Sequence, residues 1–175
     1  LKNQMIETLD LGLFPECVWL MQGKQNPTQF GKANRVKIQR YSDIVDLELL
    51  TFRQAKPSIL EALHSTDPVE RYWGATVSAS FGAEASPLLN DLYNLLEDTE
   101  AFVRSRAIVA LSRLKQIDPV IPMKGALKDT KSGAESLLIL NDMTYLKETG
   151  YDFKLNKAEV PINCTGTDWR IEYLK

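Results

Sequence analysis

Apolar side chains recur at helical spacing along most of this chain, and cap residues, prolines and glycines separate the runs. Residues three and four apart lie on one face of an α-helix, so this spacing predicts a series of amphipathic helices. The predicted helices cover 42–55, 57–63, 67–81, 86–96, 100–114, 118–127 and 132–143. Because the turns between them are short, about three to five residues, consecutive helices are expected to pair as antiparallel hairpins.

The clearest helix start signal lies just before residue 68. Asp67 is a typical N-cap, Pro68 suits the first helical position, and Glu70 is placed to reach back and complete a capping box. Gly82 favours the left-handed conformation that ends a helix. Further start signals are Pro57, Ser86-Pro87, Asp118-Pro119 and the capping box Ser132-x-x-Glu135.

The two ends of the chain lack this regularity. Residues 1–40 contain scattered glycines and prolines without a sustained helical period, which predicts an extended or irregular arm. Residues 149–175 are expected to form a tail that packs on or caps the helices. It is irregular at first, and over 168–174 the pattern fits a capped helical turn or an alternating strand, of which we favour the helix. Residues 41–148 form the predicted helical domain.

The segment around Arg71 returns 33 residues later around Arg104. A fixed period of this length is typical of stacked repeats, so the pattern predicts an all-α fold, a short α-solenoid of HEAT-like antiparallel helix hairpins. Asp67 and Arg71 are four residues apart, as are Glu100 and Arg104, and each pair can meet on one helix face. In a stack, such acid and arginine positions can also bond the adjacent hairpin. These four residues are the predicted structural repeat positions.

Composition and charge are ordinary for a globular protein. The 175 residues are 44% hydrophobic and 25% charged, with a net charge of -2. This charge gives no electrostatic reason to expect nucleic-acid binding. No apolar segment approaches the roughly 18–20 residues that a membrane-spanning helix needs. We therefore expect neither nucleic acid nor membrane insertion.

The residues that carry chemistry in other proteins form no catalytic pattern here. The single histidine, His64, lies in a predicted turn without a Cys or Ser arrangement around it, which favours a solvated side chain. Phosphate-binding glycine motifs and metal-ligand spacings are absent from the sequence, so we expect no catalytic residue, cofactor or metal. Cys17 and Cys164 are far apart in sequence, and whether they pair stays open. Tyr72 and Trp73 are a candidate contact surface, with inter-helix core the favoured role of Trp73.

Two segments together resemble a known family. Residues 7–16 are similar to an e-t-x-D-x-G-x-x-P-E segment that follows the catalytic fold in many formylglycine-type sulfatases. In a bacterial subset of that family, this segment leads into helical repeats with a D-P-x-x-R-Y-W-G/A-A phrase, which residues 67–75 resemble. The resemblance covers roughly residues 5–145, with both segments in the expected order.

This resemblance implies the C-terminal, non-catalytic part of a sulfatase, packed against its catalytic domain and periplasmic or secreted with it. The family's nucleophile lies in a C/S-x-P-x-R motif that neither Cys17 nor Cys164 fits, so no catalytic or calcium-binding residue is carried over. Two alternatives stay open. One is a free-standing HEAT-like scaffold that binds another protein surface, and the other is an enzyme resembling the phycobilin-lyase branch of HEAT-like proteins.

Overall fold

The computed structural model describes residues 27–161 and 169–175, which fold into α-helices and short 3-10 helices without a β-strand. The α-helices are α4 (Pro27–Ala33), α5 (Arg35–Val45), α6 (Phe52–Leu63), α7 (Pro68–Ser80), α8 (Leu89–Asn94), α9 (Ala101–Arg113), α10 (Val120–Lys128), α11 (Gly133–Glu148) and α12 (Trp169–Tyr173). The 3-10 helices are η1 (Asp46–Leu49), η2 (Gly82–Leu88), η3 (Leu95–Glu97) and η4 (Lys157–Glu159). The all-α class expected from the hydrophobic pattern is confirmed.

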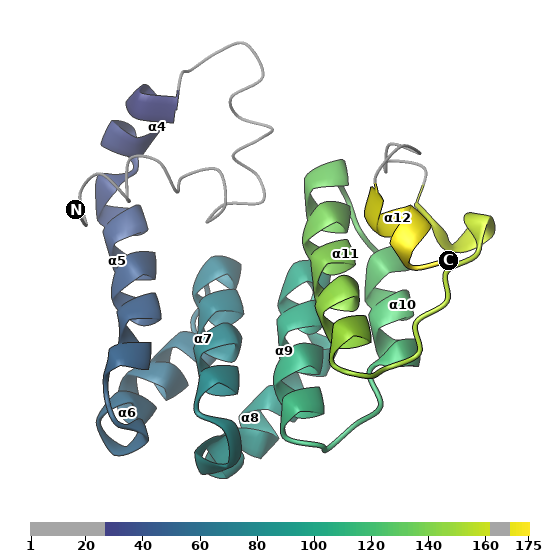
Figure 1. The fold of residues 1–175 in the computed structure, drawn as a ribbon. Helices are drawn as coiled ribbons and strands as arrows, with labels where there is room; N and C mark the ends of the chain where they lie inside the picture. Colours follow the sequence, from purple (N-terminus) through teal and green to yellow (C-terminus); the bar gives the residue numbers. More distant parts are fainter. Residues whose placement is uncertain (1–26, 162–168) are drawn as a thin grey trace.

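Helices α5, α7, α9 and α11 lie side by side in chain order, as Figure 1 shows. Helix α7 packs on α5, α6 and α9, and α9 packs in turn on α8, α10 and α11. Ten of the 13 residues of α9 are buried. A helix enclosed on nearly every side is a core helix, so α9 is the central element of this part of the chain.

Two hydrophobic clusters fill the interior, and α9 contributes to both. The first joins α5 to α9 around Ile59, Ala75 and Leu111. The second joins α9, α10 and α11 around Met123 and includes Phe153 from the tail. Burial of each large apolar side chain stabilises the fold by about 1.5–3 kcal/mol, so the two clusters hold the helical row together from both sides of α9.

The C-terminal tail is attached to the helices by specific hydrogen bonds. The Tyr151 hydroxyl donates to the carbonyl of Ser112 at 3.2 Å, and the Lys124 ammonium donates to the carbonyl of Lys154 at 2.6 Å. Phe153 is fully buried between these two contacts. The last stretch of chain forms the helix α12, as favoured from the sequence, and Ile171 is its buried residue.

The expected extended arm is wrong for residues 27–40, which lie in α4 and α5. Residues 1–26 lie outside the described part of the chain. The helical part of the chain therefore begins before residue 41. Ile38, Tyr41 and Ile44 have helical spacing and form the buried face of α5. The polar residues between them form its solvated face. Because polar residues predominate in this segment, the helical spacing of its few apolar residues is difficult to recognise in the sequence.

The predicted boundaries around Pro57 are also wrong. The helix expected over 42–55 is interrupted at Leu50, which has an extended backbone, and α6 starts at Phe52 rather than at Pro57. Thr51 and Gln54 form a capping box there, in which the Gln54 side chain accepts a hydrogen bond from the Thr51 N–H at 3.1 Å. This local start signal prevails, and α6 tolerates the proline in its interior.

Two other local signals have opposite outcomes. Gly82 has a φ of +53° directly after α7, which confirms the left-handed stop. Ser86-Pro87 does not open a helix, because both residues lie inside η2 and α8 begins at Leu89. The Ser86 hydroxyl donates back to the carbonyl of Ala83 within η2.

Gly74 is the point of closest approach between α6 and α7. A Cβ placed on Gly74 would lie 3.1 Å from the Ala62 Cβ and 3.1 Å from the Leu63 backbone nitrogen. A backbone atom cannot rotate away, so a larger side chain must push the two helices apart.

We therefore expect Gly74→Leu to lower the free energy of unfolding by about 1–3 kcal/mol, in spite of the better helix propensity of leucine. The matched control is Gly125→Leu in α10, where a Cβ would meet nothing within 4 Å. Urea unfolding followed by circular dichroism measures both variants. Equal effects of the two substitutions would contradict the close-approach explanation.

Candidate functional site

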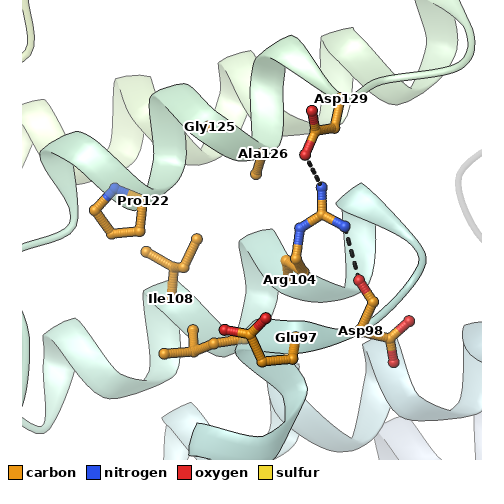
Figure 2. A pocket seen from close by; sticks show the side chains of 9 residues that line it. Glu97, Asp98, Arg104, Ile108, Pro122, Gly125, Ala126 and Asp129 are labelled. Carbon is orange, nitrogen blue, oxygen red and sulfur yellow. Dashed lines mark hydrogen bonds and ion pairs between the residues drawn. The ribbon is translucent and has the colours of Figure 1, made fainter.

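A pocket of about 410 Å³ lies between α9 and α10 (Figure 2). Ile108 and Ala126 supply part of its apolar lining, and Arg104 lies at its polar edge. The Arg104 guanidinium donates to the carbonyl of Asp98 and to the carboxylate of Asp129, each at 2.7 Å. Both ends of this cation are engaged within the fold, so its evident role is to connect α9 to the turns on either side.

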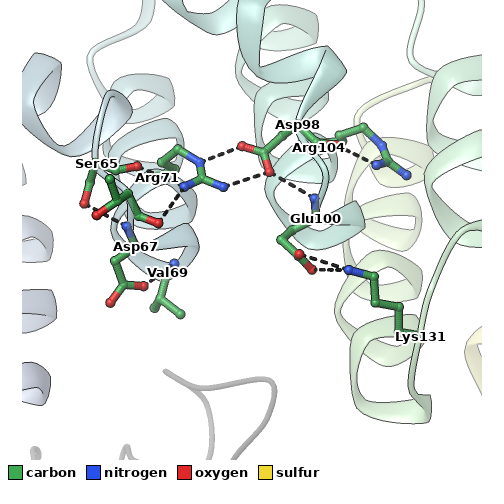
Figure 3. Close-up of polar contacts among 9 residues, drawn as sticks. Ser65, Asp67, Val69, Arg71, Asp98, Glu100, Arg104 and Lys131 are labelled. Carbon is green, nitrogen blue, oxygen red and sulfur yellow. Dashed lines mark hydrogen bonds and ion pairs between the residues drawn. The ribbon is translucent and has the colours of Figure 1, made fainter.

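Arg71 in α7 makes the same type of connection one hairpin earlier (Figure 3). Its Nε and Nη2 donate to the two carboxylate oxygens of Asp98 at 2.6 and 2.9 Å. Its Nη1 donates to the carbonyls of Ser65 and Thr66 at 2.9 and 3.2 Å. A bidentate arginine–carboxylate pair of this kind is strong and geometrically specific.

Arg71 and Arg104 therefore share one geometry. Each bonds a carbonyl six residues earlier in its own chain segment, and each bonds an aspartate in the turn before the next long helix. We call Arg71, Asp98, Arg104 and Asp129 the arginine ladder. It links α7 to the start of α9, and α9 to the turn before α11.

The helix-face pairs expected from sequence are not the ones that form. Arg71 forms its ion pair with Asp98 and not with Asp67. Arg104 forms its ion pair with Asp129 and not with Glu100. Each arginine therefore bonds an acid outside its own helix, and this acid differs from the one expected. Glu100 contributes as well, because the Lys131 ammonium donates to both of its carboxylate oxygens at 2.9 and 2.8 Å.

Asp98 and Asp129 escaped the sequence reasoning because they lie outside the helices that carry the arginines. They follow their partner arginines by 27 and 25 residues. The signal that could have identified them is an acid in each turn at nearly the same sequence distance from a repeated arginine.

The two pairs of the arginine ladder differ in burial. The side chains of Arg71 and Asp98 are 16% and 5% exposed, whereas Asp129 is 63% exposed. The hydrogen bonds to Asp98 raise the pKa of Arg71, although burial opposes this shift. The first pair is thus a protected interaction and the second is screened by solvent.

Asp67 is the N-cap of α7, and its carboxylate accepts from the Val69 N–H at 2.9 Å. The same carboxylate accepts from the Tyr41 hydroxyl at 2.7 Å and lies 3.3 Å from the Lys37 ammonium. Glu70 does not complete the expected capping box, because its carboxylate accepts a hydrogen bond from the Arg40 guanidinium instead. Burial by itself raises the pKa of Asp67, but the bonds from Tyr41, Val69 and Lys37 outweigh it and leave the pKa below its usual 3.8.

A lowered pKa in the folded state stabilises the protein above the usual pKa and ceases to do so as the pH falls through the folded value. Asp67→Asn keeps a cap acceptor and removes the charge. We expect this variant to be less stable than the parent by about 1 kcal/mol at pH 7, with the difference closing as the pH falls below the usual pKa of 3.8 and through the lower folded value. Thermal unfolding at these pH values measures it, and a pH-independent difference would contradict the assignment.

A second polar cluster crosses the interior from α7 to α11. The Arg106 guanidinium in α9 donates to the Tyr72 hydroxyl at 2.7 Å, and its Nη1 lies 3.1 Å from Asp142 Oδ1 in α11. Its Cζ lies 4.8 Å from the centre of the Tyr72 ring, within the range of a cation–π contact. Burial raises the pKa of Asp142, and the charge of Arg106 opposes that shift. We call Tyr72, Arg106 and Asp142 the buried network.

Tyr72 does not offer the contact surface considered from sequence, because it is only 4% exposed and its hydroxyl is bound by Arg106. Trp73 is half-buried and packs against the first hydrophobic cluster. Its ring stands nearly perpendicular to that of Tyr72, at 5.1 Å between centroids. The indole Nε1 is buried without a hydrogen-bond partner, so core packing describes Trp73 better than a ligand contact.

The remaining candidates from the sequence are His64 and the two cysteines. His64 is an exposed side chain whose Nε2 lies 2.7 Å from Asp91 Oδ1, where it links the end of α6 to α8. Within 27–161 and 169–175, no group of three or more His, Cys, Asp or Glu side chains is arranged to hold a metal ion. Cys17 and Cys164 lie outside the described residues.

No protein-family model, curated protein or solved structure matches this chain. Among the helices that the structure describes, none is both long and apolar enough to cross a bilayer.

Proposed function

We propose that this chain is a non-catalytic interaction domain, a HEAT-like stack of helix hairpins that packs against the catalytic domain of a sulfatase. The observation that carries the proposal is the repeated geometry of Arg71 and Arg104. Two arginines 33 residues apart bond their surroundings in the same way, through a carbonyl six residues back and an aspartate in the next turn.

Such a repeated contact supports a stacked arrangement because each hairpin then presents the same bonding groups to the next one. Stacked helical repeats form extended surfaces, and their usual role is to bind another protein or domain. The side-by-side order of α5, α7, α9 and α11 is consistent with this arrangement.

The assignment to a sulfatase rests on the sequence alone. Its support is the order of two segments, the arm over 7–16 and the repeat phrase over 67–75. The arm lies outside the described residues. Within the phrase, Asp67, Arg71 and Tyr72 each make a bond to a residue outside α7, which supports a structural role for these residues in the proposed stack.

The decisive experiment is to sequence the gene upstream of the codon for Leu1. We expect an alkaline-phosphatase-like catalytic domain with a C/S-x-P-x-R motif in the same reading frame. Its absence would contradict the sulfatase assignment. Affinity capture that then enriches a macromolecular partner would favour the free-standing scaffold.

A second experiment tests the non-catalytic role when the upstream domain is present. The catalytic domain and this chain are expressed as separate polypeptides, and light scattering after gel filtration measures their association. We expect a one-to-one complex, with hydrolysis of an aryl sulfate probe only in samples that contain the catalytic domain. Hydrolysis by this chain alone, or binding of a bilin in an absorbance titration, would contradict the proposal.

A further inference from the structure

The buried network joins three helices that are consecutive in the row. Tyr72 lies in α7, Arg106 in α9 and Asp142 in α11, and α9 stands between the other two helices (Figure 1). Tyr72 and Asp142 both bond Arg106 and so are connected through it. Burial raises the pKa of Tyr72, the charge of Arg106 opposes this shift, and the charge of Asp142 adds to it to a smaller extent.

The polar groups of this network are incompletely satisfied. Among the described residues, the buried side-chain atoms without a hydrogen-bond partner are Trp73 Nε1, Arg106 Nε and Asp142 Oδ2. Two of them belong to the network, and the third belongs to the neighbour of Tyr72. Since nearly all buried polar atoms in native proteins are bonded, the concentration of all three in one place distinguishes it from the rest of the interior.

Stability alone does not account for such an arrangement. A buried ion pair gains little over apolar side chains of the same size, because both charges must leave water. In some proteins a buried ion pair instead specifies a unique arrangement, since any shift of one helix leaves a charge without its partner.

We propose that the buried network is a conformational coupler, which fixes the position of α11 relative to α7 across the intervening α9. A change at Tyr72 then alters the local stability of α11, and a change at Asp142 alters the local stability of α7. Thermodynamic coupling between two positions is reciprocal, so both effects must be present together. The coupler would keep the surface formed by the row of helices in one shape, whatever partner binds there.

The test is amide hydrogen exchange by NMR on the intact chain. Tyr72→Phe removes one hydroxyl and leaves the ring in place. We expect the amides of α11 over 139–146 to exchange about tenfold faster than in the parent, beyond any change in global unfolding.

Tyr41→Phe is the matched control. Tyr41 is also fully buried, and its hydroxyl makes a bond of the same 2.7 Å length, to Asp67 at the start of α7. We expect this variant to affect α5 and α7 and to leave exchange in α11 unchanged. Equal effects of the two variants on α11, or no effect of Tyr72→Phe there, would overturn the proposal.

Asp142→Asn tests the reverse direction. It keeps the shape of the side chain and removes the charge that pairs with Arg106. We expect faster exchange in α7 over 72–78, although Asp142 lies two helices away. Exchange that changes only in α9 and α11 would show separate local bonds and would overturn the coupler.

Discussion

Replacing Arg106 by methionine is expected to lower the free energy of unfolding by about 3–5 kcal/mol, the largest effect of any single change considered for this chain. Methionine retains the apolar contacts of the side chain but leaves the Asp142 carboxylate buried without its cation. Asp142 is 3% exposed, so water cannot replace the lost partner. Urea unfolding at pH 7 measures the loss.

The same variant has a pH signature. Burial already raises the pKa of Asp142, and the charge of Arg106 holds that shift back. Without Arg106 the folded protein binds the proton of Asp142 more readily than the unfolded chain does, so stability rises as the pH falls through the folded pKa. We expect the stability deficit of Arg106→Met to shrink on acidification.

The double variant Arg106→Met with Asp142→Leu is the control. It removes both charges, and we expect it to recover most of the lost stability, because a buried pair can be replaced by apolar side chains at little cost. If the double variant is no more stable than Arg106→Met alone, the loss comes from packing and not from the unpaired charge.

The second large effect is expected at Arg71. Substitution by methionine should cost about 2–4 kcal/mol, because it leaves the Asp98 carboxylate, which is 5% exposed, without its bidentate partner. The carbonyls of Ser65 and Thr66 lose their donor in the same step.

Arg104→Met is the matched comparison, since Arg104 occupies the equivalent position one hairpin later. Its partner Asp129 is 63% exposed and regains water when the arginine is lost. We expect a cost of about 1 kcal/mol, and a smaller one at high salt, because exposed pairs are screened. Thermal unfolding of both variants at low and high ionic strength measures this. Equal costs would show that burial does not distinguish the two pairs.

Predictions from short-range sequence patterns were confirmed where the interacting groups are close in sequence. The cap at Asp67, the left-handed Gly82 and the cap at Ser132 each involve residues no more than four positions apart. The groups that form each of these interactions lie within one helical turn of each other, so a short stretch of sequence contains both partners. The all-α class followed from the same kind of information, because helical periodicity is local.

Boundaries failed where two local signals competed. Pro57 is a good helix start, but the Thr51–Gln54 capping box lies upstream and begins α6 earlier. Ser86-Pro87 has the composition of a helix start, yet the chain there continues the 3-10 helix η2 that follows Gly82. In both cases a feature a few residues upstream set the boundary, and the composition of the downstream signal alone did not reveal which of the two would prevail.

In the candidate site, too, one part was predicted from the sequence and another part was not. Its arginines at 71 and 104 were found from the repeat, whereas the acids that bind them were assigned wrongly. Helix-face spacing identifies which residues can meet on one helix. It does not reveal that a side chain reaches a turn 25 to 27 residues further on.

The sequence by itself determined that this chain is helical, where several of its helices begin and end, and that two arginines recur at a period of 33 residues. Only the tertiary structure decided what those arginines bind and that Tyr72, Arg106 and Asp142 meet in the interior. The reason is physical: the partners lie 34 and 36 residues apart in sequence, and only the packing of α7, α9 and α11 brings them within bonding distance.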